Sequence, residues 1–268
     1  MEQTYVRALR AIYSLFSVED KVVTITGAAQ GMGASAAEIF AEAGAKVVVA
    51  DFNAEKGEAQ AAKIRDHGGE AQFCKVDVSN EDQVEAMVQF AVDTYGRLDV
   101  AINNAARTPD DKPIADMNIE EFDAVMGVDL RGVALCLKYE IRQMMAQGEG
   151  GSIINTASVS GIRPQPGTPA YVTAKHGVIG LTKQAALDYS HYGIRINAVA
   201  PGAIDTPMLR GALEQFGLDP DSYAKELSML GRFGRPEEIA KSYLWLASDL
   251  SSFVTGTTLE VDGGYSNK

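Results

Sequence analysis

Cysteine and histidine are scarce in this chain of 268 residues, and their scarcity excludes several kinds of chemistry. The two cysteines, Cys74 and Cys136, lie far apart and outside any CxxC pattern. This excludes a disulfide framework and a thiolate zinc site and favours a reducing compartment. The three histidines, His67, His176 and His191, lack the spacing of metal ligands, and the GxSxG motif of hydrolases does not occur. We expect neither a metal site nor serine-hydrolase activity.

Positive charge and long apolar runs are also in short supply. The chain has 24 lysines and arginines against 36 aspartates and glutamates, a net charge of -12, and no basic block or stripe. This argues against a partner with a phosphate backbone, such as nucleic acid. No apolar run approaches the roughly 20 residues that cross a membrane. We expect a cytoplasmic protein without a nucleic-acid or membrane partner.

Residues 1–17 differ in pattern from the rest and predict an N-terminal extension. Apolar residues such as Val6, Leu9 and Phe16 recur at roughly helical spacing, and arginines are interleaved with them. No long apolar core or small-residue cleavage site follows, which argues against a signal peptide. We expect the extension to pack on the body or on a neighbouring subunit, with a helix on a membrane surface as the alternative.

From Lys21 onward, short apolar runs alternate with helix-length segments. Strands are predicted at residues 22–26, 46–51, 71–77, 98–103, 152–155, 194–199 and 258–261, and helices at residues 34–43, 54–67, 81–95, 119–146 and 174–189. This alternation predicts a parallel sheet with helices on both faces. The strands are rich in Val, Ile and Leu without regular polar alternation, as expected when both faces are covered. Since no linker interrupts residues 18–268, we predict a single α/β domain.

The first predicted strand is followed by TGAAQGMG, which opens directly into a helix. A dinucleotide site needs this construction, because Gly27 allows a tight turn, Gly31 lets the backbone approach the pyrophosphate, and Gly33 allows the helix to pack closely on the strand. The amino end of the helix then offers free N–H groups to the phosphates. The cofactor contacts expected in this loop are Gly27, Gln30, Gly31, Met32 and Gly33.

An acid at the end of the second predicted strand indicates which dinucleotide is bound. Asp51 closes the run VVVAD, where its carboxylate can accept hydrogen bonds from ribose hydroxyls and would repel a 2′-phosphate. The sequence therefore favours NAD over NADP, with a solvated aspartate at a strand end as the alternative. Asp77 and Val78, at the end of the third predicted strand, are expected to edge and cover the adenine.

The stretch 155–175 contains the side chains that we expect to perform the chemistry. Tyr171 and Lys175 lie four residues apart at the start of a predicted helix, so both stand on one helical face. A nearby cation favours the phenolate form of a tyrosine, which then exchanges a proton with a substrate oxygen. Ser158 follows an apolar strand, where its hydroxyl can hold the same oxygen while charge develops on it. Such a pair is common by chance, and it gains weight from the phosphate loop that precedes it.

These motifs occur together and in order. The sequences TGAAQGMG, NNAA at 103–106, YVTAK at 171–175 and PGAIDTPM at 201–208, together with Ser158, resemble the short-chain dehydrogenase/reductase family over about residues 18–266. The resemblance implies a single Rossmann-type domain with a seven-stranded parallel sheet. It also implies a nicotinamide cofactor, bound along the carboxyl ends of the strands.

The resemblance further assigns roles to individual residues. It implies that Tyr171 is the acid or base, that Lys175 assists it and holds the nicotinamide ribose, and that Ser158 orients the substrate oxygen. Asn104 is expected near the cofactor ribose. The loop expected over the nicotinamide contains Pro201, Gly202, Ile204 and Thr206.

Members of the family are commonly dimers or tetramers, and the resemblance places the interface on helices that include residues 134–145 and 174–189. Both segments carry wide apolar faces, formed by Leu135, Leu137, Ile141, Val178 and Leu181. We expect a homo-oligomer, either a tetramer or a dimer. Burial of these faces inside the subunit is the alternative.

Two positions depart from the family pattern. Ala106 stands where a glycine is usual, which would strain the backbone if that position needs a positive φ. Asp129, in VDLRG, stands where an asparagine usually serves as a fourth member of the catalytic group. Aspartate has nearly the same shape but lacks two donors and can carry a charge. We expect Asp129 either to pair with Lys175 or to be protonated. The alternative is that aspartate replaces asparagine here without any effect on function.

The segment of about residues 205–230 combines apolar side chains with helix breakers and is predicted to be a small helical substrate lid. With Ile162 and Pro164, its apolar residues indicate an uncharged, mostly hydrocarbon substrate. Packing of the lid on the body is the alternative explanation. A substrate carboxylate is a further possibility, for which the candidate ligands are Arg107, Arg163 and Arg210.

The sequence as a whole predicts an oxidoreductase that interconverts a secondary alcohol and a ketone by hydride transfer to or from NAD(H), with a cyclic or bulky, mostly apolar substrate. A hydroxysteroid dehydrogenase and a 3-oxoacyl-carrier-protein reductase are the alternatives within the family. A non-catalytic NAD-binding sensor is the alternative from another class. A nucleotide-sugar epimerase usually carries a larger C-terminal domain than about sixty residues allow.

Overall fold

The structure is a computed structural model that describes residues 17–268. The predicted N-terminal extension therefore lies, except for Ser17, outside the described residues. Seven strands are present: β1 (Val22–Thr26), β2 (Lys46–Asp51), β3 (Glu70–Lys75), β4 (Val100–Asn103), β5 (Gly151–Thr156), β6 (Ile194–Pro201) and β7 (Thr258–Val261). They form one sheet in the order β3-β2-β1-β4-β5-β6-β7, and every pairing is parallel. The predicted seven-stranded parallel sheet is confirmed.

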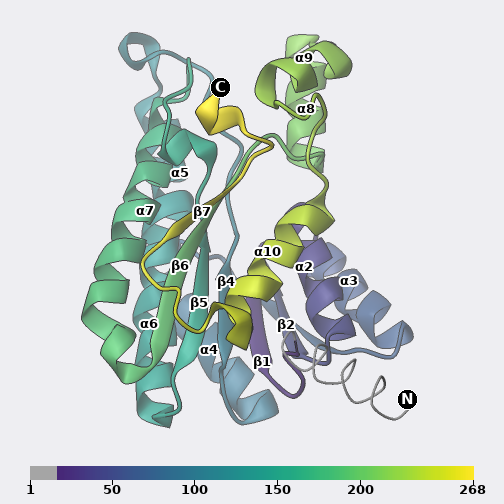
Figure 1. Ribbon diagram of the computed structural model, residues 1–268, viewed down its shortest axis with the longest axis vertical. Helices are drawn as coiled ribbons and strands as arrows, with labels where there is room; N and C mark the ends of the chain where they lie inside the picture. Colours follow the sequence, from purple (N-terminus) through teal and green to yellow (C-terminus); the bar gives the residue numbers. More distant parts are fainter. Residues whose placement is uncertain (1–16) are drawn as a thin grey trace, which may run out of the picture.

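Helices cover both faces of this sheet. The helices of the described residues are α2 (Gly31–Glu42), α3 (Ala54–Asp66), α4 (Glu81–Tyr95), α5 (Ile119–Met126), α6 (Val133–Gln147), α7 (Pro169–Tyr189), α8 (Pro207–Phe216), α9 (Pro220–Leu227) and α10 (Pro236–Ala247). One face is covered by α2, α3 and α10, and the other by α4, α6 and α7 (Figure 1). None of the helices within residues 17–268 combines the length and the apolar character needed to cross a bilayer.

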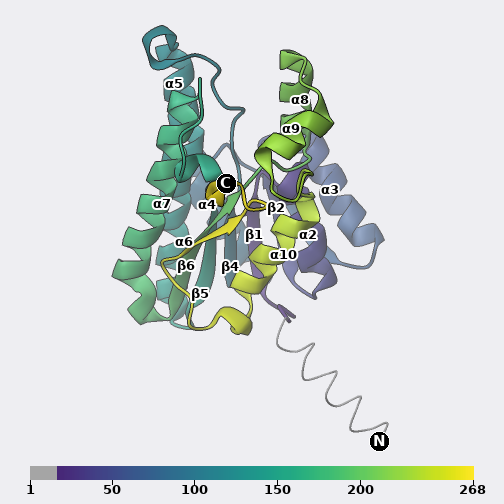
Figure 2. The ribbon, with the colours of Figure 1, turned by 45° about the horizontal axis from the view of Figure 1, so that its top comes forward.

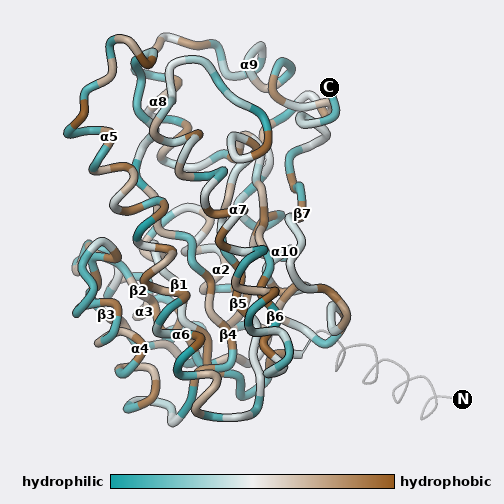
Figure 3. The backbone as a smooth tube through the Cα atoms, turned by 90° about the vertical axis from the view of Figure 1, so that its left-hand side faces the viewer, coloured by the Kyte–Doolittle hydropathy of each residue, from teal (hydrophilic) through white to brown (hydrophobic). Residues whose placement is uncertain are grey.

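The sheet is buried on both faces because its side chains alternate between two cores. In β2, Val47 and Val49 belong to the core under α2 and α3, whereas Val48 and Ala50 belong to the core under α4. Each core needs an apolar residue at every second position, so the strand as a whole is continuously apolar. Hydrophobic and hydrophilic stretches alternate along the surrounding helices (Figure 3), because each helix presents only one side to the sheet.

Several predicted boundaries were wrong. The strand predicted at residues 71–77 ends at Lys75, because the Asp77 carboxylate turns back to accept hydrogen bonds from the N–H and hydroxyl of Ser79. The strand predicted at 98–103 begins only at Val100. The helix predicted at 119–146 is interrupted by a π-helical turn, η2 (Gly127–Gly132).

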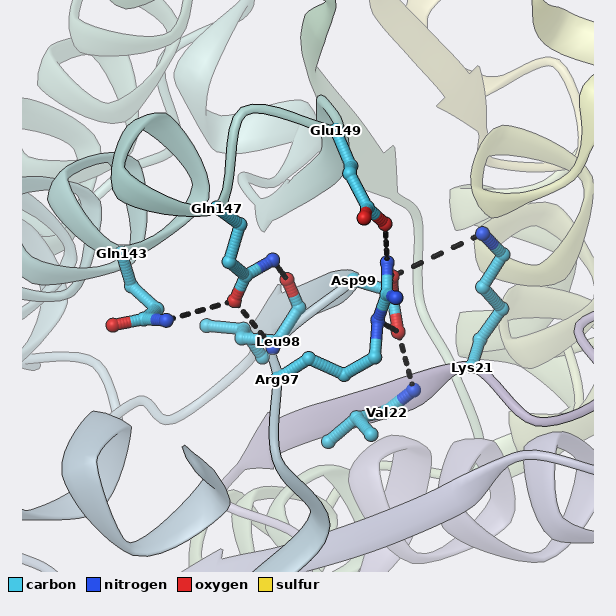
Figure 4. Close-up of polar contacts among 8 residues, drawn as sticks. All are labelled: Lys21, Val22, Arg97, Leu98, Asp99, Gln143, Gln147 and Glu149. Carbon is cyan, nitrogen blue, oxygen red and sulfur yellow. Dashed lines mark hydrogen bonds and ion pairs between the residues drawn. The ribbon is translucent and has the colours of Figure 1, made fainter. Parts of the chain in front are cut away.

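A cluster of charged and amide side chains lies at the amino ends of the central strands (Figure 4). The Asp99 carboxylate accepts the backbone N–H of Val22 at 2.9 Å and three hydrogen bonds from Nε and Nη2 of Arg97, which also donates to Glu149 at 2.7 Å. Gln147 completes the cluster by bonding both the N–H and the carbonyl of Leu98. These contacts join β1, β4 and the connection into β5 at the edge opposite the phosphate loop. The carboxyl edge is left for the site.

Two short helices, α8 and α9, stand beyond the carboxyl edge, at the end of the molecule that also carries α5 and the start of α7 (Figures 1 and 2). They occupy the segment predicted as a substrate lid. The C-terminal residues lie against them, since Lys268 Nζ donates to the carbonyls of Lys225 and Glu226 near the end of α9. The segment therefore lies where it can cover ligands bound at the carboxyl ends of the strands.

Candidate active site

The glycine-rich loop between β1 and α2 has the geometry of a phosphate site. Gly27 and Gly31 have φ values of +65° and +59°, a region that favours glycine. A Cβ added to Gly33 would lie 2.2 Å from the carbonyl oxygen of Gly27. The N-cap residue Gln30 uses its side-chain oxygen to accept a hydrogen bond from Lys56 at 3.2 Å and does not cap the helix. The N–H groups at the amino end of α2 remain available to an anion.

Asn104 holds this loop against the end of β4. Its Nδ2 donates to the carbonyls of Thr26 and Gly27 at 3.0 and 3.2 Å, and its backbone N–H donates to the Thr26 hydroxyl at 3.0 Å. No group within residues 17–268 donates to its buried Oδ1. An unpartnered buried acceptor beside a phosphate loop fits a site for a hydroxyl-bearing ligand such as a cofactor ribose. The residues present therefore suit the dinucleotide that the sequence predicts.

Asp51 is fixed beside the loop. Its two carboxylate oxygens accept the backbone N–H groups of Ala29, at 3.0 Å, and of Asn53, at 2.9 Å, and the side chain is buried. A carboxylate has about four acceptor positions, so two remain for ribose hydroxyls. These hydrogen bonds hold a negative charge at the end of β2, where the sequence predicted it.

The remaining predicted cofactor contacts differ in their surroundings. Asp77 is exposed, and its carboxylate accepts a hydrogen bond from the Ser79 N–H. Val78 is buried, and its side chain packs against Gly132. Met32 packs partly against the core under α10. The sequence placed Asp77 and Val78 at the end of a strand, and the structure places them in the turn that follows it.

The predicted loop after β6 reaches the phosphate loop. Pro201 ends the strand, and Gly202 packs so closely on Asp262 that a Cβ would lie 2.8 Å from its Cα. Ile204 is buried and paired with Gly234 in an isolated bridge. Thr206 caps α8 and lies 3.5 Å from the place of a Cβ on Gly31. The loop thus borders the same cleft.

Tyr171 and Lys175 stand together in the first turns of α7. The ammonium of Lys175 lies 5.3 Å from the centroid of the Tyr171 ring. Lys175 is among the largest fully buried side chains of the described residues, whereas Tyr171 is half-buried. Its Nζ donates to the carbonyl of Thr156, at the end of β5, at 3.1 Å. A fixed, desolvated cation next to a partly accessible phenol is the arrangement expected for a proton-transfer site.

Asp129 forms an ion pair with this lysine. Its Oδ2 lies 3.3 Å from Lys175 Nζ, its Oδ1 accepts the backbone N–H of Arg107 at 2.8 Å, and both charged side chains are buried. Burial alone would lower the pKa of Lys175, but the Asp129 carboxylate and the Tyr171 phenol more than offset it, so the pKa lies above its usual value. Burial raises the pKa of Asp129, and Lys175 opposes that rise. Of the arrangements that the sequence left open, the structure shows the contact with Lys175.

Ser158 lies just past β5, in the turn that leads into η3 (Val159–Gly161). Its hydroxyl accepts the backbone N–H of Ser160 at 3.1 Å, and the side chain is buried. The turn is packed directly on α7, because a Cβ added to Gly161 would lie 2.6 Å from the Lys175 carbonyl. This contact brings Ser158 to the segment of α7 that carries the Tyr/Lys pair.

The sequence did not indicate two further groups at the site. One is the Thr156 carbonyl, which accepts from Lys175. The other is Asp110, whose carboxylate accepts the backbone N–H groups of Ala170 and Tyr171 at 2.9 and 3.0 Å. Neither follows from a motif, because both are contacts between segments distant in the chain.

The structure bears on two expectations from the sequence: possible backbone strain at Ala106 and the arginines considered as ligands of a substrate carboxylate. Among residues 17–268, Asp20 is the only non-glycine residue with a positive φ, so Ala106 sits without strain. Of the arginines considered for a substrate carboxylate, Arg210 is paired in two hydrogen bonds with Asp205, and Arg163 donates to the carbonyls of Tyr265 and Lys268.

The fold and this site define an oxidoreductase that uses a nicotinamide cofactor. A family model described as Enoyl-(Acyl carrier protein) reductase matches residues 27–266. The chain is 46% identical over 252 residues to the short chain dehydrogenase/reductase astE of Aspergillus oryzae, covering 94% of this chain and 97% of that protein. It is 41% identical over 249 residues to cyclohexanol dehydrogenase of an Acinetobacter species, covering 93% and 96%.

A solved structure agrees with these relatives. The crystal structure of levodione reductase has a TM-score of 0.88 and 39% sequence identity, covering 93% of this chain and 98% of that one. The chain belongs to the short-chain dehydrogenase/reductase family. Its relatives named above include a dehydrogenase and a reductase that act on CH–OH groups or the corresponding ketones.

Proposed function

We propose that the protein is an NAD-dependent dehydrogenase that interconverts a cyclic or bulky, mostly apolar secondary alcohol and its ketone. The observation that carries the proposal is the buried Lys175 ammonium, 5.3 Å from the Tyr171 ring. The packing of Ser158 and its turn on the same helix supports it. The bound cofactor supplies the chemistry of hydride transfer.

The protein side chains have three roles in this mechanism. Tyr171, as phenolate, takes the proton of the substrate hydroxyl in the oxidative direction and returns it in the reductive one. Lys175 favours the phenolate through its charge and lies where it can hold the nicotinamide ribose. The Ser158 hydroxyl orients the substrate oxygen. Pro201, Gly202, Ile204 and Thr206 border the nicotinamide end of the cleft.

We assign NAD as the cofactor because of Asp51. The carboxylate is held at the end of β2 by two backbone N–H groups, and its negative charge suits ribose hydroxyls but would repel a 2′-phosphate. In the proposed mode Asn104 lies at a cofactor ribose, Gln30 and Met32 at the phosphate loop, and Asp77 and Val78 at the adenine. Activity measured in parallel with NAD and NADP checks this assignment, and a higher kcat/KM with NADP would contradict it.

The proposed substrate class has support from the lid segment and from the relatives. Large apolar side chains are exposed in the segment that we propose as the lid: Met208, Phe216, Leu218, Met229 and Leu230. Ile162, on the loop after Ser158, is also exposed. Cyclohexanol and levodione appear in the names of two relatives. An apolar ring suits such a surface better than a charged chain does.

Replacement of Tyr171 tests the mechanism. We expect purified protein with NAD to oxidise cyclohexanol or a related cyclic alcohol, as seen from the absorbance of the reduced cofactor. Tyr171→Phe removes the proton acceptor, and kcat should fall at least about 100-fold. The dissociation constant for NAD, measured by calorimetry, should stay within about twofold because the phosphate loop is intact. A variant that kept its turnover would refute the role of Tyr171.

The alternatives predict other results with the same protein. A hydroxysteroid dehydrogenase would prefer steroid alcohols in the substrate panel, and a 3-oxoacyl-carrier-protein reductase would prefer NADPH and an acyl ketone. A non-catalytic sensor would bind NAD and turn over none of the panel. Membership of a family of oxidoreductases and the intact Ser/Tyr/Lys set favour the enzyme.

We also propose that the protein is cytoplasmic and forms a homo-oligomer, with residues 18–268 as one domain and the lid at about 205–230. Both cysteines are free, which suits a reducing compartment. The residues first considered for the interface do not support it, because Leu135, Leu137, Ile141 and Val178 are buried in the subunit core and Leu181 packs, partly buried, against that core. The support comes instead from exposed apolar residues such as Leu187 and Phe253.

A further inference from the structure

The helix that carries Tyr171 lacks a cap from its own sequence. The N-cap residue of α7 is Thr168, whose hydroxyl donates to the carbonyl of Gln165 at 3.3 Å and does not cap the first-turn N–H groups. Pro169 occupies the first helical position, where a missing N–H costs nothing. The N–H groups of Ala170 and Tyr171 still need acceptors, because Ala170 is buried.

A carboxylate from sixty residues earlier supplies both acceptors. Asp110 Oδ2 accepts the N–H of Ala170 at 2.9 Å, and its Oδ1 accepts the N–H of Tyr171 at 3.0 Å. Asp110 is only 5% exposed. Its neighbours Asp111 and Lys112 are exposed, so the chain turns this one side chain inward. A negative charge at the amino end of a helix is also favoured by the helix dipole.

The segment that carries Asp110 is tied to the cofactor cleft at its other end. It leaves β4 at Asn104, which clamps the phosphate loop, and passes Arg107, whose backbone N–H donates to Asp129 at 2.8 Å. Asp129 in turn pairs with Lys175. The segment therefore spans from the phosphate loop to the start of α7. Hydrogen bonds made by Asn104, Arg107 and Asp110 hold it in place.

We infer that Asp110 is a positioning residue, which caps α7 across the cleft and thereby fixes the Tyr171 backbone relative to the phosphate loop. It holds the N–H of Tyr171 itself, so loss of the carboxylate frees the first turn of α7 at the residue that carries the phenol. Displacement of a reacting group by about 1 Å lowers turnover by as much as about 100-fold. The inference rests on the proposed function of Tyr171.

Two substitutions at Asp110, with a matched control, test this. In Asp110→Ala we expect kcat for a cyclic alcohol to fall about 10- to 100-fold. The dissociation constant for NAD should change less than about twofold, because the phosphate loop keeps its own contacts. Asp110→Asn should recover part of the lost turnover, since asparagine caps helices about as well as aspartate but offers one oxygen here. Asp116→Ala, at an exposed position of the same segment, is the control.

Amide hydrogen exchange gives a readout that is independent of activity. We expect faster exchange at Ala170 and Tyr171 in Asp110→Ala than in the wild type and in Asp116→Ala. Equal kcat in Asp110→Ala and in the control would overturn the inference. It would also be overturned if kcat fell equally in Asp110→Ala and Asp110→Asn and both variants lost NAD binding. If the wild type oxidises no alcohol, the proposed function fails. The exchange rates then still decide whether Asp110 fixes this turn.

Discussion

The carboxylate of Asp129 changes the charge that acts on Tyr171. It lies 3.3 Å from the Lys175 ammonium, and the phenol ring lies 5.3 Å from that same ammonium. When Asp129 is ionised, the net charge of the buried pair is close to zero, and the field at the phenol is weaker than an unpaired lysine would provide. A site with asparagine at this position would carry the full positive charge.

Asp129→Asn therefore tests the effect of this charge. We expect the variant to stay active, because asparagine keeps an oxygen for the Arg107 N–H. The limb of the kcat/KM profile that reports the base form should move to lower pH, since an ammonium without its counter-charge favours the base form of a neighbouring group. Asp116→Asn, the same change at an exposed position, is the control. Superimposable profiles for the wild type and Asp129→Asn would show that the charge is not felt.

Helix α6 buries a further carboxylate, which has no cation beside it in the part of the chain that the structure describes. Glu140 is fully buried and accepts a hydrogen bond from Asn103 Nδ2 at 2.9 Å, while no group in residues 17–268 bonds its Oε1. Burial raises the pKa of Glu140 from 4.5 to about 7, and the Asn103 hydrogen bond opposes that rise. The folded state therefore holds this proton more tightly than the unfolded state does.

This difference predicts how stability depends on pH. Because the folded pKa is raised, the neutral form of Glu140 stabilises the fold fully below about pH 4.5, and that contribution is lost as the pH rises to about 7. Glu140→Gln should remove this loss. Relative to wild type, the free energy of unfolding of the variant should gain about 3 kcal/mol between pH 4.5 and 7.5, measured by urea titration. The control, Glu85→Gln at an exposed site of α4, should show no such gain in the free energy of unfolding. The absence of a gain in Glu140→Gln would show that the pKa of the Glu140 carboxyl group is not raised.

How far the elements could be predicted depends on how local their cause is. The strands at 22–26, 46–51 and 258–261 match their predictions, because period and flanking turns lie within the segment itself. The break at η2 was missed, because a glycine at each end of the segment does not by itself distinguish a π-helical turn from a continuous α-helix. The capping role of Asp110 was also missed, because an acceptor sixty residues away leaves no spacing to detect.

For the whole molecule, the sequence predicted the sheet, the cleft and the Tyr/Lys pair, because the glycine loop and the alternating elements fix the topology. It did not separate core from interface. Apolar faces on α6 and α7 satisfy either use, and only the packed fold shows that Leu135 and Val178 face inward. The N-terminal extension stays a prediction.

The exposed apolar residues lead to a test of assembly. Leu187, 78% exposed on α7, and Phe253, fully exposed before β7, belong to segments joined by a hydrogen bond between Ser190 and Thr255. We expect light scattering to give the mass of a dimer or tetramer. Leu187→Ser combined with Phe253→Ser should shift the protein toward smaller species, because burial of such side chains contributes about 1.5–3 kcal/mol each. A wild-type monomer at micromolar concentration would contradict the proposal.

The π-helical turn at Gly127–Gly132 has a consequence for how such a site can arise. An α-helix advances about 100° per residue, so an extra residue in a purely α-helical turn would rotate everything downstream by that angle. The wider π-helical turn takes up such a residue locally, so α5 keeps its contacts with α7 and α6 keeps its contacts with the sheet. Within that turn the backbone places Asp129 next to Lys175.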